Sequence, residues 1–236
     1  MFMIENTYIL QIETATPVCS VAISKNGETI AKVEADAPNL HASHLTLFIE
    51  QALEKVVITR NDLTAVAISM GPGSYTGLRI GVSTAKGLCY ALDIPLIAVN
   101  TLEAMAYGFV SQKAMADETS IFVPMIDARR MEVYMAQYNP QLQCVAETAA
   151  RIIDEDAFAG RSENKRYVLF GSGADKFETL FGNEEMIQVE TGFRNSASFF
   201  DKLAFQKFQQ GIFEDVVYFE PYYLKDFIAT TPKKRI

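Results

Sequence analysis

Cysteine and histidine are scarce in this chain, which limits the chemistry that its side chains can support. The three cysteines, Cys19, Cys89 and Cys144, are odd in number and far apart, so they form neither a disulfide framework nor a metal knuckle. Two histidines leave little choice of general base, and the stretch around Ser74 does not match the Gly-x-Ser-x-Gly elbow of serine hydrolases. The sequence therefore offers no support for nucleophilic catalysis, proteolysis included.

Positive charge is also in short supply. The chain has 21 lysines and arginines against 29 aspartates and glutamates, which gives a net charge of −8. This balance argues against direct binding of a nucleic-acid backbone. In a nucleic-acid pathway, a partner would have to supply the positive surface.

Long apolar runs are absent as well. No stretch approaches the roughly 20 residues that a membrane-spanning helix needs. The N-terminal residues 1–6 carry no basic group and lead directly into a predicted strand, unlike a signal peptide. We therefore expect no membrane contact and a cytoplasmic location.

The hydrophobic pattern predicts the same order of elements in both halves of the 236-residue chain. The first half is predicted to contain strands at Thr7–Ile12, Val18–Ser24 and Glu28–Glu34, a helix at 42–57, a strand at 63–70, a helix at 76–92 and a strand at Pro95–Val99. The second half follows a helix near 101–113 and is predicted to contain strands at Ile121–Ile126, Val133–Tyr138 and near Leu142–Thr148, a short helix near 154–160, a strand at Tyr167–Phe170, and helices at 174–181 and 196–210. This order predicts a duplicated mixed α/β unit.

The most specific stretch is the run from Gly71 to Gly81, Gly-Pro-Gly-Ser-Tyr-Thr-Gly-Leu-Arg-Ile-Gly, between a predicted strand and helix. Its glycines permit close backbone approach, and Ser74 or Thr76 can cap the helix. Such a turn can hold an anion or can simply connect strand to helix, and we favour the plain connection. The run has neither the Gly-Lys-Ser/Thr of a Walker loop nor the spacing of a dinucleotide-binding turn.

Several motifs together resemble the TsaB family of the actin/hexokinase-like superfamily. The resemblance rests on Glu13-Thr-Ala-Thr with Cys19-Ser-Val-Ala, His41, the run from Gly71 to Gly81, Ile126-Asp-Ala-Arg-Arg130 with Glu132-Val-Tyr134, Gly171-Ser-Gly-Ala174, and Pro221-Tyr-Tyr-Leu-Lys-Asp226. It implies two ribonuclease-H-like lobes, each a mixed sheet flanked by helices, that face a nucleotide cleft. The N-terminal lobe would cover residues 1–100, joined by part of 212–230, and the C-terminal lobe 101–211. The family commonly has Asp where this chain has Glu13, and Gly where it has Met131.

The same resemblance implies a role. Members of the family look like non-catalytic partners that bind and activate a TsaD-like paralogue, which transfers a threonylcarbamoyl group to the adenosine next to the anticodon of tRNA. A TsaE-like ATPase would join them, and tRNA would be reached only through the complex. The chain would form a homodimer when alone and would require no cofactor, with weak ATP or ADP binding as an open expectation. The catalytic relative has a His-x-x-x-His metal pair where this chain has Thr101 and Met105, which argues against metal-assisted chemistry.

The presumed cleft contains two carboxylates whose role the sequence leaves open. Glu13 and Asp127 can hold a hydrated Mg²⁺ between the lobes, or each can cap N–H groups of its own turn, which is the interpretation we favour. Used with the loop Gly171–Gly173, they would make the chain a stand-alone nucleotide-binding phosphotransferase, which is the alternative function. The residues considered for anion binding in the cleft are Glu13, Thr14, Gly71, Gly73, Ser74, Thr76, Asp127, Arg129, Gly171 and Gly173.

His41 and His44 are three residues apart, a spacing that can place both on one helix face. A metal site would need further ligands nearby, and the sequence offers few. We favour one histidine near the start of the helix and the other on its surface.

The helix at 76–92 has only two charged residues and reads as apolar on nearly every side. One side can pack on its own sheet, and the other would need a partner, so that this helix and the helix at 42–57 would form half of a four-helix bundle. Alternatively, residues 212–230 of the same chain cover it. The residues predicted for the partner surface are His41, Leu47, Gly77, Leu78, Gly81, Val82, Ala85 and Cys89. The substitution Gly81→Arg is expected to abolish pairing while the fold survives.

Overall fold

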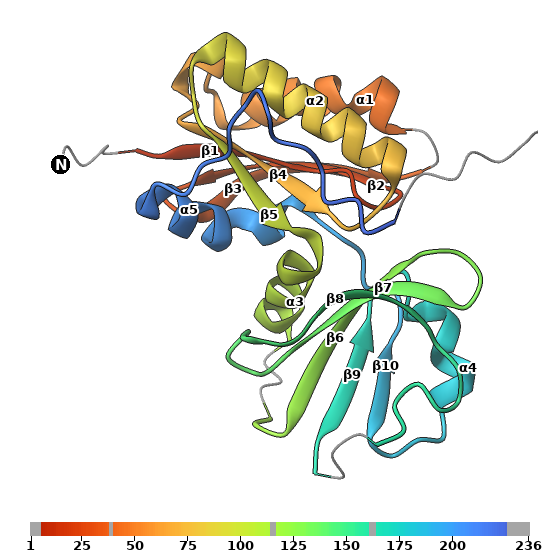
Figure 1. Ribbon diagram of the computed structural model, residues 1–236. Helices are drawn as coiled ribbons and strands as arrows, with labels where there is room; N and C mark the ends of the chain where they lie inside the picture. The colour runs from red at the N-terminus through yellow and green to blue at the C-terminus, as the bar shows by residue number, and fades with distance from the viewer. Residues whose placement is uncertain (1–5, 38–39, 114–116, 161–163, 226–236) are drawn as a thin grey trace, which may run out of the picture.

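Two five-stranded sheets with the same strand order make up the body of the protein (Figure 1). The computed structural model describes residues 6–37, 40–113, 117–160 and 164–225. The first sheet, in the order β3-β2-β1-β4-β5, contains β1 (Tyr8–Glu13), β2 (Val18–Lys25), β3 (Glu28–Asp36), β4 (Ala65–Gly71) and β5 (Leu96–Asn100). The second, in the order β10-β9-β6-β7-β8, contains β6 (Ser120–Asp127), β7 (Glu132–Tyr138), β8 (Cys144–Ile152), β9 (Arg166–Phe170) and β10 (Ile187–Glu190).

The two sheets share their pairing pattern, which confirms the predicted duplication. In each sheet the first strand in sequence pairs antiparallel with the second and parallel with the fourth, and the fifth extends the parallel side. The first hairpin turns at Asn26 and Gly27, whose φ values of 53° and 80° are the left-handed values that a two-residue hairpin loop requires. Each lobe is therefore a mixed sheet of the ribonuclease-H-like kind.

Helices cover both faces of the first sheet (Figure 1). On one side lie α1 (Leu40–Val56) and α2 (Tyr75–Leu92), with the short turn η1 (Arg60–Asp62) and then β4 between them in the chain. The buried positions of α1 recur at helical spacing, at Leu45, Phe48, Ile49, Ala52 and Leu53, and face the sheet. On the other side lie η3 (Ala197–Phe200) and α5 (Asp201–Gln210).

The last helix packs with the first lobe, although the expected division at residue 211 placed it in the second. Phe200 and Ala204 belong to the same buried cluster as Ile9, Ala67 and Val99 of the first sheet. The last helix packs there because the first sheet presents an apolar face on the side opposite α1 and α2. Residues from the far end of the chain therefore complete the core of the first lobe.

The helix α3 (Thr101–Gln112) joins the lobes and is buried on nearly every side. It packs on β6 of the second sheet and on β4 and β5 of the first. Asn100 caps its start by accepting from the N–H groups of Leu102 and Glu103. A Cβ atom at Gly108 would lie 2.2 Å from the ring of Phe199, so glycine is required where α3 meets η3.

The second lobe has shorter helices than predicted. After η2 (Asp175–Phe177) comes the single turn α4 (Glu178–Phe181). The predicted helix near 154–160 is wrong, because residues 155–160 form turns that bury only Phe158, in the cluster with Tyr167 and Phe181. The strand predicted near 142–148 begins two residues later and ends at 152, and β10 was not predicted. No helix in the described ranges is long and apolar enough to cross a bilayer.

Candidate functional site

The glycine-rich turn between β4 and α2 packs directly against the turn that follows β1. A Cβ atom at Gly73 would lie 2.3 Å from the carbonyl oxygen of Ala15, and one at Gly77 would lie 2.1 Å from that of Thr14. The N–H of Ser74 donates to the Ala15 carbonyl (2.7 Å), and the Ser74 hydroxyl accepts from the N–H of Gly77 (3.2 Å). Glycine is needed here because two backbone segments approach closely. The N–H groups of Ser74 and Gly77 are thus engaged within the chain.

The corresponding turn of the second lobe, between β9 and η2, repeats this arrangement. Gly171 has a φ of +102°, and a Cβ atom there would lie 2.4 Å from the Met125 carbonyl oxygen. Gly173 donates its N–H to the same carbonyl (3.0 Å), and a Cβ atom on it would lie 2.8 Å from the carbonyl carbon of Ile126. In both lobes, glycine brings the turn after the fourth strand onto the end of the first strand.

Glu13 ends β1 and has only 1% of its surface exposed. One carboxylate oxygen accepts from the N–H of Ala15 (2.5 Å), and the other accepts from the side-chain amide of Asn195 (3.5 Å). Burial raises the pKa of Glu13 to about 7, against the opposing effect of these hydrogen bonds. Thr14, the next residue, is fully buried as well. This carboxyl group, with a pKa near neutral pH, is engaged by its own turn and by Asn195.

Asp127 has the equivalent position at the end of β6, but it is exposed. Its Oδ1 accepts from the N–H of Arg129 (3.0 Å) and from Nζ of Lys176 (2.6 Å). Lys176 also donates to the backbone carbonyls of Arg130 and Glu132, so the lysine ties the carboxylate to its own turn. Arg129, with a φ of 77°, is exposed and makes no ion pair with any described residue.

The two carboxylates thus lie in opposite surroundings, one buried and the other neutralised by a lysine. A hydrated Mg²⁺ would need both of them ionised and free to turn toward it. Over residues 6–37, 40–113, 117–160 and 164–225, no three aspartate, glutamate, histidine or cysteine side chains gather as metal ligands. The geometry does not favour the phosphotransferase alternative.

The two histidines have separate surroundings. Burial lowers the pKa of His41, in the first turn of α1, against the opposing effect of the nearby backbone of Val18 and Thr16. His44 contacts the Ser43 hydroxyl through Nδ1 (2.7 Å). His41 therefore contacts the turn after β1, and His44 contacts a neighbour on its own helix.

Thr101 and Met105 stand where the resemblance places metal ligands in a catalytic relative. Both are fully buried in α3. Met105 packs in an apolar cluster with Phe122 and Phe170. A threonine hydroxyl and a thioether in an apolar cluster do not replace two imidazole ligands.

Six of the eight residues predicted for the partner surface are buried inside the chain, which corrects their assignment to an outer face. They form the inner side of α2 and pack on β4 and on the turn after β1, and they are Gly77, Leu78, Gly81, Val82, Ala85 and Cys89. A Cβ atom at Gly81 would lie 2.2 Å from the Thr14 hydroxyl oxygen, so Gly81→Arg would disrupt the fold and cannot report on pairing. Leu47 remains on the surface, and His41 is half-buried.

The outer face of α2 carries a second stripe of small residues that the sequence pattern did not single out. Ser83, Gly87 and Ala91 follow one another at intervals of four and are all exposed, and nothing lies within 4 Å of the Cβ position of Gly87. Tyr90 on α2 and Leu47 on the adjacent α1 add large apolar surface, 84% and 52% exposed. The exposed residues of the helix are Thr76, Arg79, Ser83, Gly87, Tyr90 and Ala91, of which only Arg79 is charged. The buried small residues Gly77, Gly81 and Ala85 form an inner stripe, and Ser83, Gly87 and Ala91 form the outer stripe. Both stripes have a spacing of four residues, so burial alone distinguishes them.

Residues 212–225, which we call the strap, run along the first lobe beside α2 (Figure 1). Lys86 of α2 donates to the backbone carbonyls of Val217 and Phe219, both at 3.0 Å. The N–H of Tyr222 donates to the carbonyl of Met70 (2.7 Å) at the end of β4. The chain therefore covers one side of α2 with its own strap, in line with the alternative that residues 212–230 cover this helix. The outer stripe of α2 stays exposed.

Replacing Lys86 by methionine is expected to loosen the strap without unfolding the protein. Methionine keeps the apolar stem but loses two charge-assisted hydrogen bonds, so protection of the Tyr222 amide should fall about tenfold. Hydrogen exchange followed by NMR measures this loss, with Lys55→Met as the matched control, because Lys55 donates to the carbonyl of Lys32 on β3. Equal protection in both variants would mean that Lys86 does not hold the strap.

Comparisons with known proteins agree over the whole fold. A family model described as TsaD, tRNA N6-adenosine threonylcarbamoyltransferase, matches residues 33–231. The chain is 30% identical to the tRNA threonylcarbamoyladenosine biosynthesis protein TsaB of Escherichia coli K12 over 227 residues, which cover 94% of this chain and 96% of that protein. The solved structure of YeaZ from Pseudomonas aeruginosa matches with a TM-score of 0.76 and 23% identity, over 92% of this chain and all of that one. An activator of 2-hydroxyisocaproyl-CoA dehydratase from Clostridium difficile, solved with ADPNP, shares only the fold, with a TM-score of 0.51 and 11% identity over 87% of this chain and 97% of that one.

Proposed function

Because this chain belongs to the TsaB family of tRNA threonylcarbamoyladenosine biosynthesis proteins, we propose that it is a non-catalytic subunit that binds and activates a TsaD-type transferase. The transferase would move a threonylcarbamoyl group to the adenosine next to the anticodon of tRNA. The observation that carries this proposal is the exposed and nearly uncharged outer face of α2. A surface helix normally turns a face with several charged side chains to water, and a face of small residues with one charge, flanked by the exposed Leu47 and Tyr90, is typical of a surface that another chain covers.

The geometry of α1 and α2 suits a partner of related fold. The TsaD family model matches most of this chain, so we expect the transferase to present a similar pair of helices. Two such pairs can pack as a four-helix bundle with axes about 8–10 Å apart. In that bundle the outer stripe would permit the close approach, and Leu47 and Tyr90 would supply contact area. Two copies of this chain would present the same surface to each other, so a homodimer is expected when the transferase is absent.

The surroundings of the cleft residues support the non-catalytic part of the proposal. Glu13 is buried and bonded to its own turn, and Asp127 is held by Lys176. Thr101 and Met105 supply no metal-binding pair. A subunit that acts through contact requires no cofactor of its own, and titration with ATP and Mg²⁺ would reveal any weak binding in the cleft.

We also propose that a TsaE-like ATPase joins the complex. This chain would then reach tRNA only as part of the complex, and not by binding tRNA itself. The net charge of −8 supports this arrangement, since the chain repels a phosphate backbone on average. The positive surface for tRNA would come from the partners.

A reconstitution experiment tests the proposal. Purified TsaD and TsaE from the same organism are assayed for threonylcarbamoyl transfer to tRNA with and without this chain. We expect activity only when all three proteins are present, and none from this chain alone. Full activity of TsaD and TsaE without the chain would refute the accessory role.

A further inference from the structure

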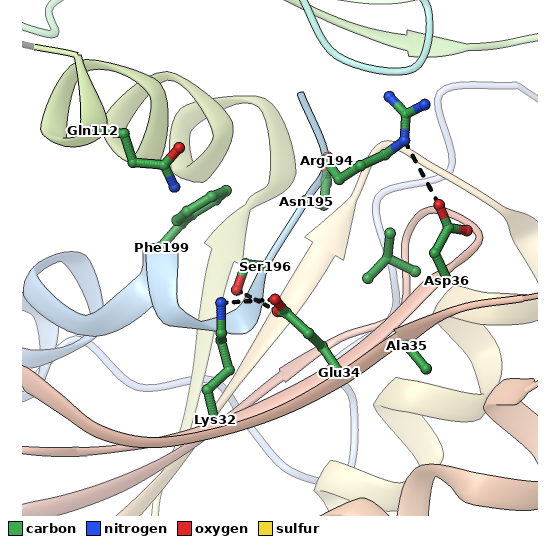
Figure 2. Close-up of a pocket in the computed structure, with 10 residues that line it drawn as sticks. Lys32, Glu34, Ala35, Asp36, Gln112, Arg194, Asn195, Ser196 and Phe199 are labelled. Carbon is green, nitrogen blue, oxygen red and sulfur yellow. Dashed lines mark hydrogen bonds and ion pairs between the residues drawn. The ribbon is translucent and has the colours of Figure 1, made fainter. Parts of the chain in front are cut away.

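The polar cavity beside β3 is lined by charged side chains that already satisfy one another (Figure 2). Lys32 forms an ion pair with Glu34 (2.7 Å), and Arg194 forms one with Asp36 (3.6 Å), as the dashed lines show. Arg194 also pairs with Asp175 (2.7 Å) of the second lobe. These pairs leave no charge for a ligand to balance. The side chains that the folded chain leaves in water lie instead on the surface around α2.

The most exposed large apolar side chains gather on this surface. Five such side chains in the described residues are at least 71% exposed, and four of them lie at the end of α1, on α2 or on the strap: Val57, Tyr90, Val217 and Tyr218. The fifth, Ile152, lies on β8 of the second lobe. Because the strap runs beside α2 (Figure 1), the four side chains border one surface, and apolar surface gathered in this way is typical of an interface.

Val57 lies at the same end of the helix pair as Tyr90. β3 and β4 both run parallel to β1, since β3 is antiparallel to β2 and β2 is antiparallel to β1. α1 follows β3 and α2 follows β4, so both helices begin at one edge of the first sheet and end at the opposite edge. Val57 comes directly after α1, and Tyr90 belongs to the last turn of α2. The valine therefore extends the apolar surface at this end.

Val57 is unfavourable for the free chain in two ways. Its φ of 56° lies in the left-handed region, where a β-branched residue is an outlier. The N–H groups of Val57 and Ile58 donate to the carbonyls of Glu54 and Leu53 (both 3.2 Å), which is the helix end that normally has glycine at this position. The Val57 side chain is also 90% exposed, whereas Val56 and Ile58 pack on the core. Contact with a partner would compensate for both costs.

The strap presents its two exposed side chains from a well-bonded turn. Asp215 Oδ1 accepts from the N–H groups of Val217 (2.7 Å) and Tyr218 (3.1 Å). Lys86, one helical turn from Tyr90 on α2, donates to the Val217 carbonyl (3.0 Å). Val217 and Tyr218 are therefore held on the flank of α2 where Tyr90 lies.

The outer face of the two helices alone offers little area for a stable interface. Its stripe consists of small residues, and Leu47 and Tyr90 are its large exposed apolar side chains. A specific interface buries about 800 Å² on each partner, and one tyrosine supplies roughly 150–250 Å². A partner would therefore have to cover elements beside α1 and α2 as well, where Val57 and the strap turn are exposed.

We propose that the TsaD-type transferase covers both turns together with the outer face of α2. Val57 would lie on one flank of the contact, and Val217 and Tyr218 on the other. This proposal rests on the proposed function, and it extends the interface from two helices to three segments of the chain. The strained backbone at Val57 is tolerated because the valine gains its contacts only in the complex.

Calorimetry with the intact chain and the purified transferase of the same organism tests the proposal. Val57→Gly should weaken binding about tenfold. It should also raise the Tm of the free chain by about 2–4 °C, because glycine adopts the left-handed backbone without strain. The double variant Val217→Ser and Tyr218→Ser should weaken binding at least about tenfold and leave the fold intact. The matched control is Ile152→Thr, which removes an equally exposed side chain on β8 and should not change binding.

The possible outcomes separate this proposal from the proposed function. If the parent chain does not bind the transferase, both are overturned. If the parent binds and either the Val57 variant or the strap variant binds equally well, only the wider interface is overturned. A lower Tm for Val57→Gly would mean that the valine serves the free fold, which would also overturn it. Loss of self-association in the ultracentrifuge, with transferase binding unchanged, would assign the turns to a contact between two copies of this chain instead.

Discussion

Replacing Gly87 by arginine is expected to abolish binding of the TsaD-type partner while leaving the free chain at least as stable as before. Nothing lies within 4 Å of a Cβ atom at Gly87, so a side chain can be added there without a clash at its base. Glycine in a helix interior costs about 1 kcal/mol relative to a good helix former, so thermal stability should hold or rise. In the proposed bundle, the same side chain and its charge would occupy the space of the partner helix. A loss of affinity of at least about 30-fold is expected by calorimetry.

Two further variants control for the added charge and for loss of the fold. Gln206→Arg places the same charge on an exposed position of α5, across the first sheet from α2, and should leave both stability and binding unchanged. Gly81→Arg should instead unfold the protein, because its side chain would enter the space of Thr14. Normal binding by a folded Gly87→Arg variant would remove the outer stripe of α2 from the interface.

Replacing Glu13 by glutamine is expected to stabilise the protein at pH 8 and to change little near pH 4.5. Burial raises the Glu13 pKa from its ordinary 4.5 to about 7, so the folded state holds a proton that the unfolded state has already released. The free energy of unfolding therefore falls as pH rises from 4.5 to 7. The loss amounts to about 3 kcal/mol, and glutamine, uncharged at every pH, avoids it. Urea unfolding of both proteins at the two pH values measures the difference.

Glu34→Gln is the matched control with the opposite sign. Burial raises the Glu34 pKa, but hydrogen bonds from Lys32, Ser196 and Ser20 and the charge of Lys32 outweigh it and hold that pKa below its ordinary value. The ionised form therefore stabilises the folded state above the unfolded pKa. This contribution is lost as pH falls. The glutamine variant should therefore be less stable than the parent at pH 8, with a difference that shrinks toward acid. A Glu13→Gln effect that does not change with pH would contradict the assignment of a raised pKa.

Much of the fold was predictable because its signals are local. The Asn26–Gly27 turn determines the first hairpin, and the stripe from Leu45 to Leu53 determines α1. The second lobe gave weaker signals. Its α4 is a single turn, β10 has four residues, and residues 155–160 bury one side chain. Segments this short show no clear hydrophobic period from which an element could be predicted.

The candidate sites were less predictable because they depend on contacts between distant parts of the chain. The glycines of α2 were recognised as a stripe, but two stripes share one spacing, and only the packing of Thr14 and Ala15 shows which faces inward. Glu13 owes part of its surroundings to Asn195, 182 residues away. One cavity is lined both by β3 and by residues between 194 and 199, which lie far apart in the sequence, so no local sequence pattern predicts it.

The packing of η3 and α5 on the first sheet has a consequence for how the chain is made. Ile9, Ala67 and Val99 are synthesised early, whereas Phe200 and Ala204, which cover them, emerge from the ribosome only after the whole second sheet. Any nascent chain that stops before residue 197 therefore leaves in water the part of that face that η3 and α5 cover. Domains usually complete folding in order of synthesis. Here the lobe whose synthesis begins first cannot complete its folding until the second lobe has been synthesised.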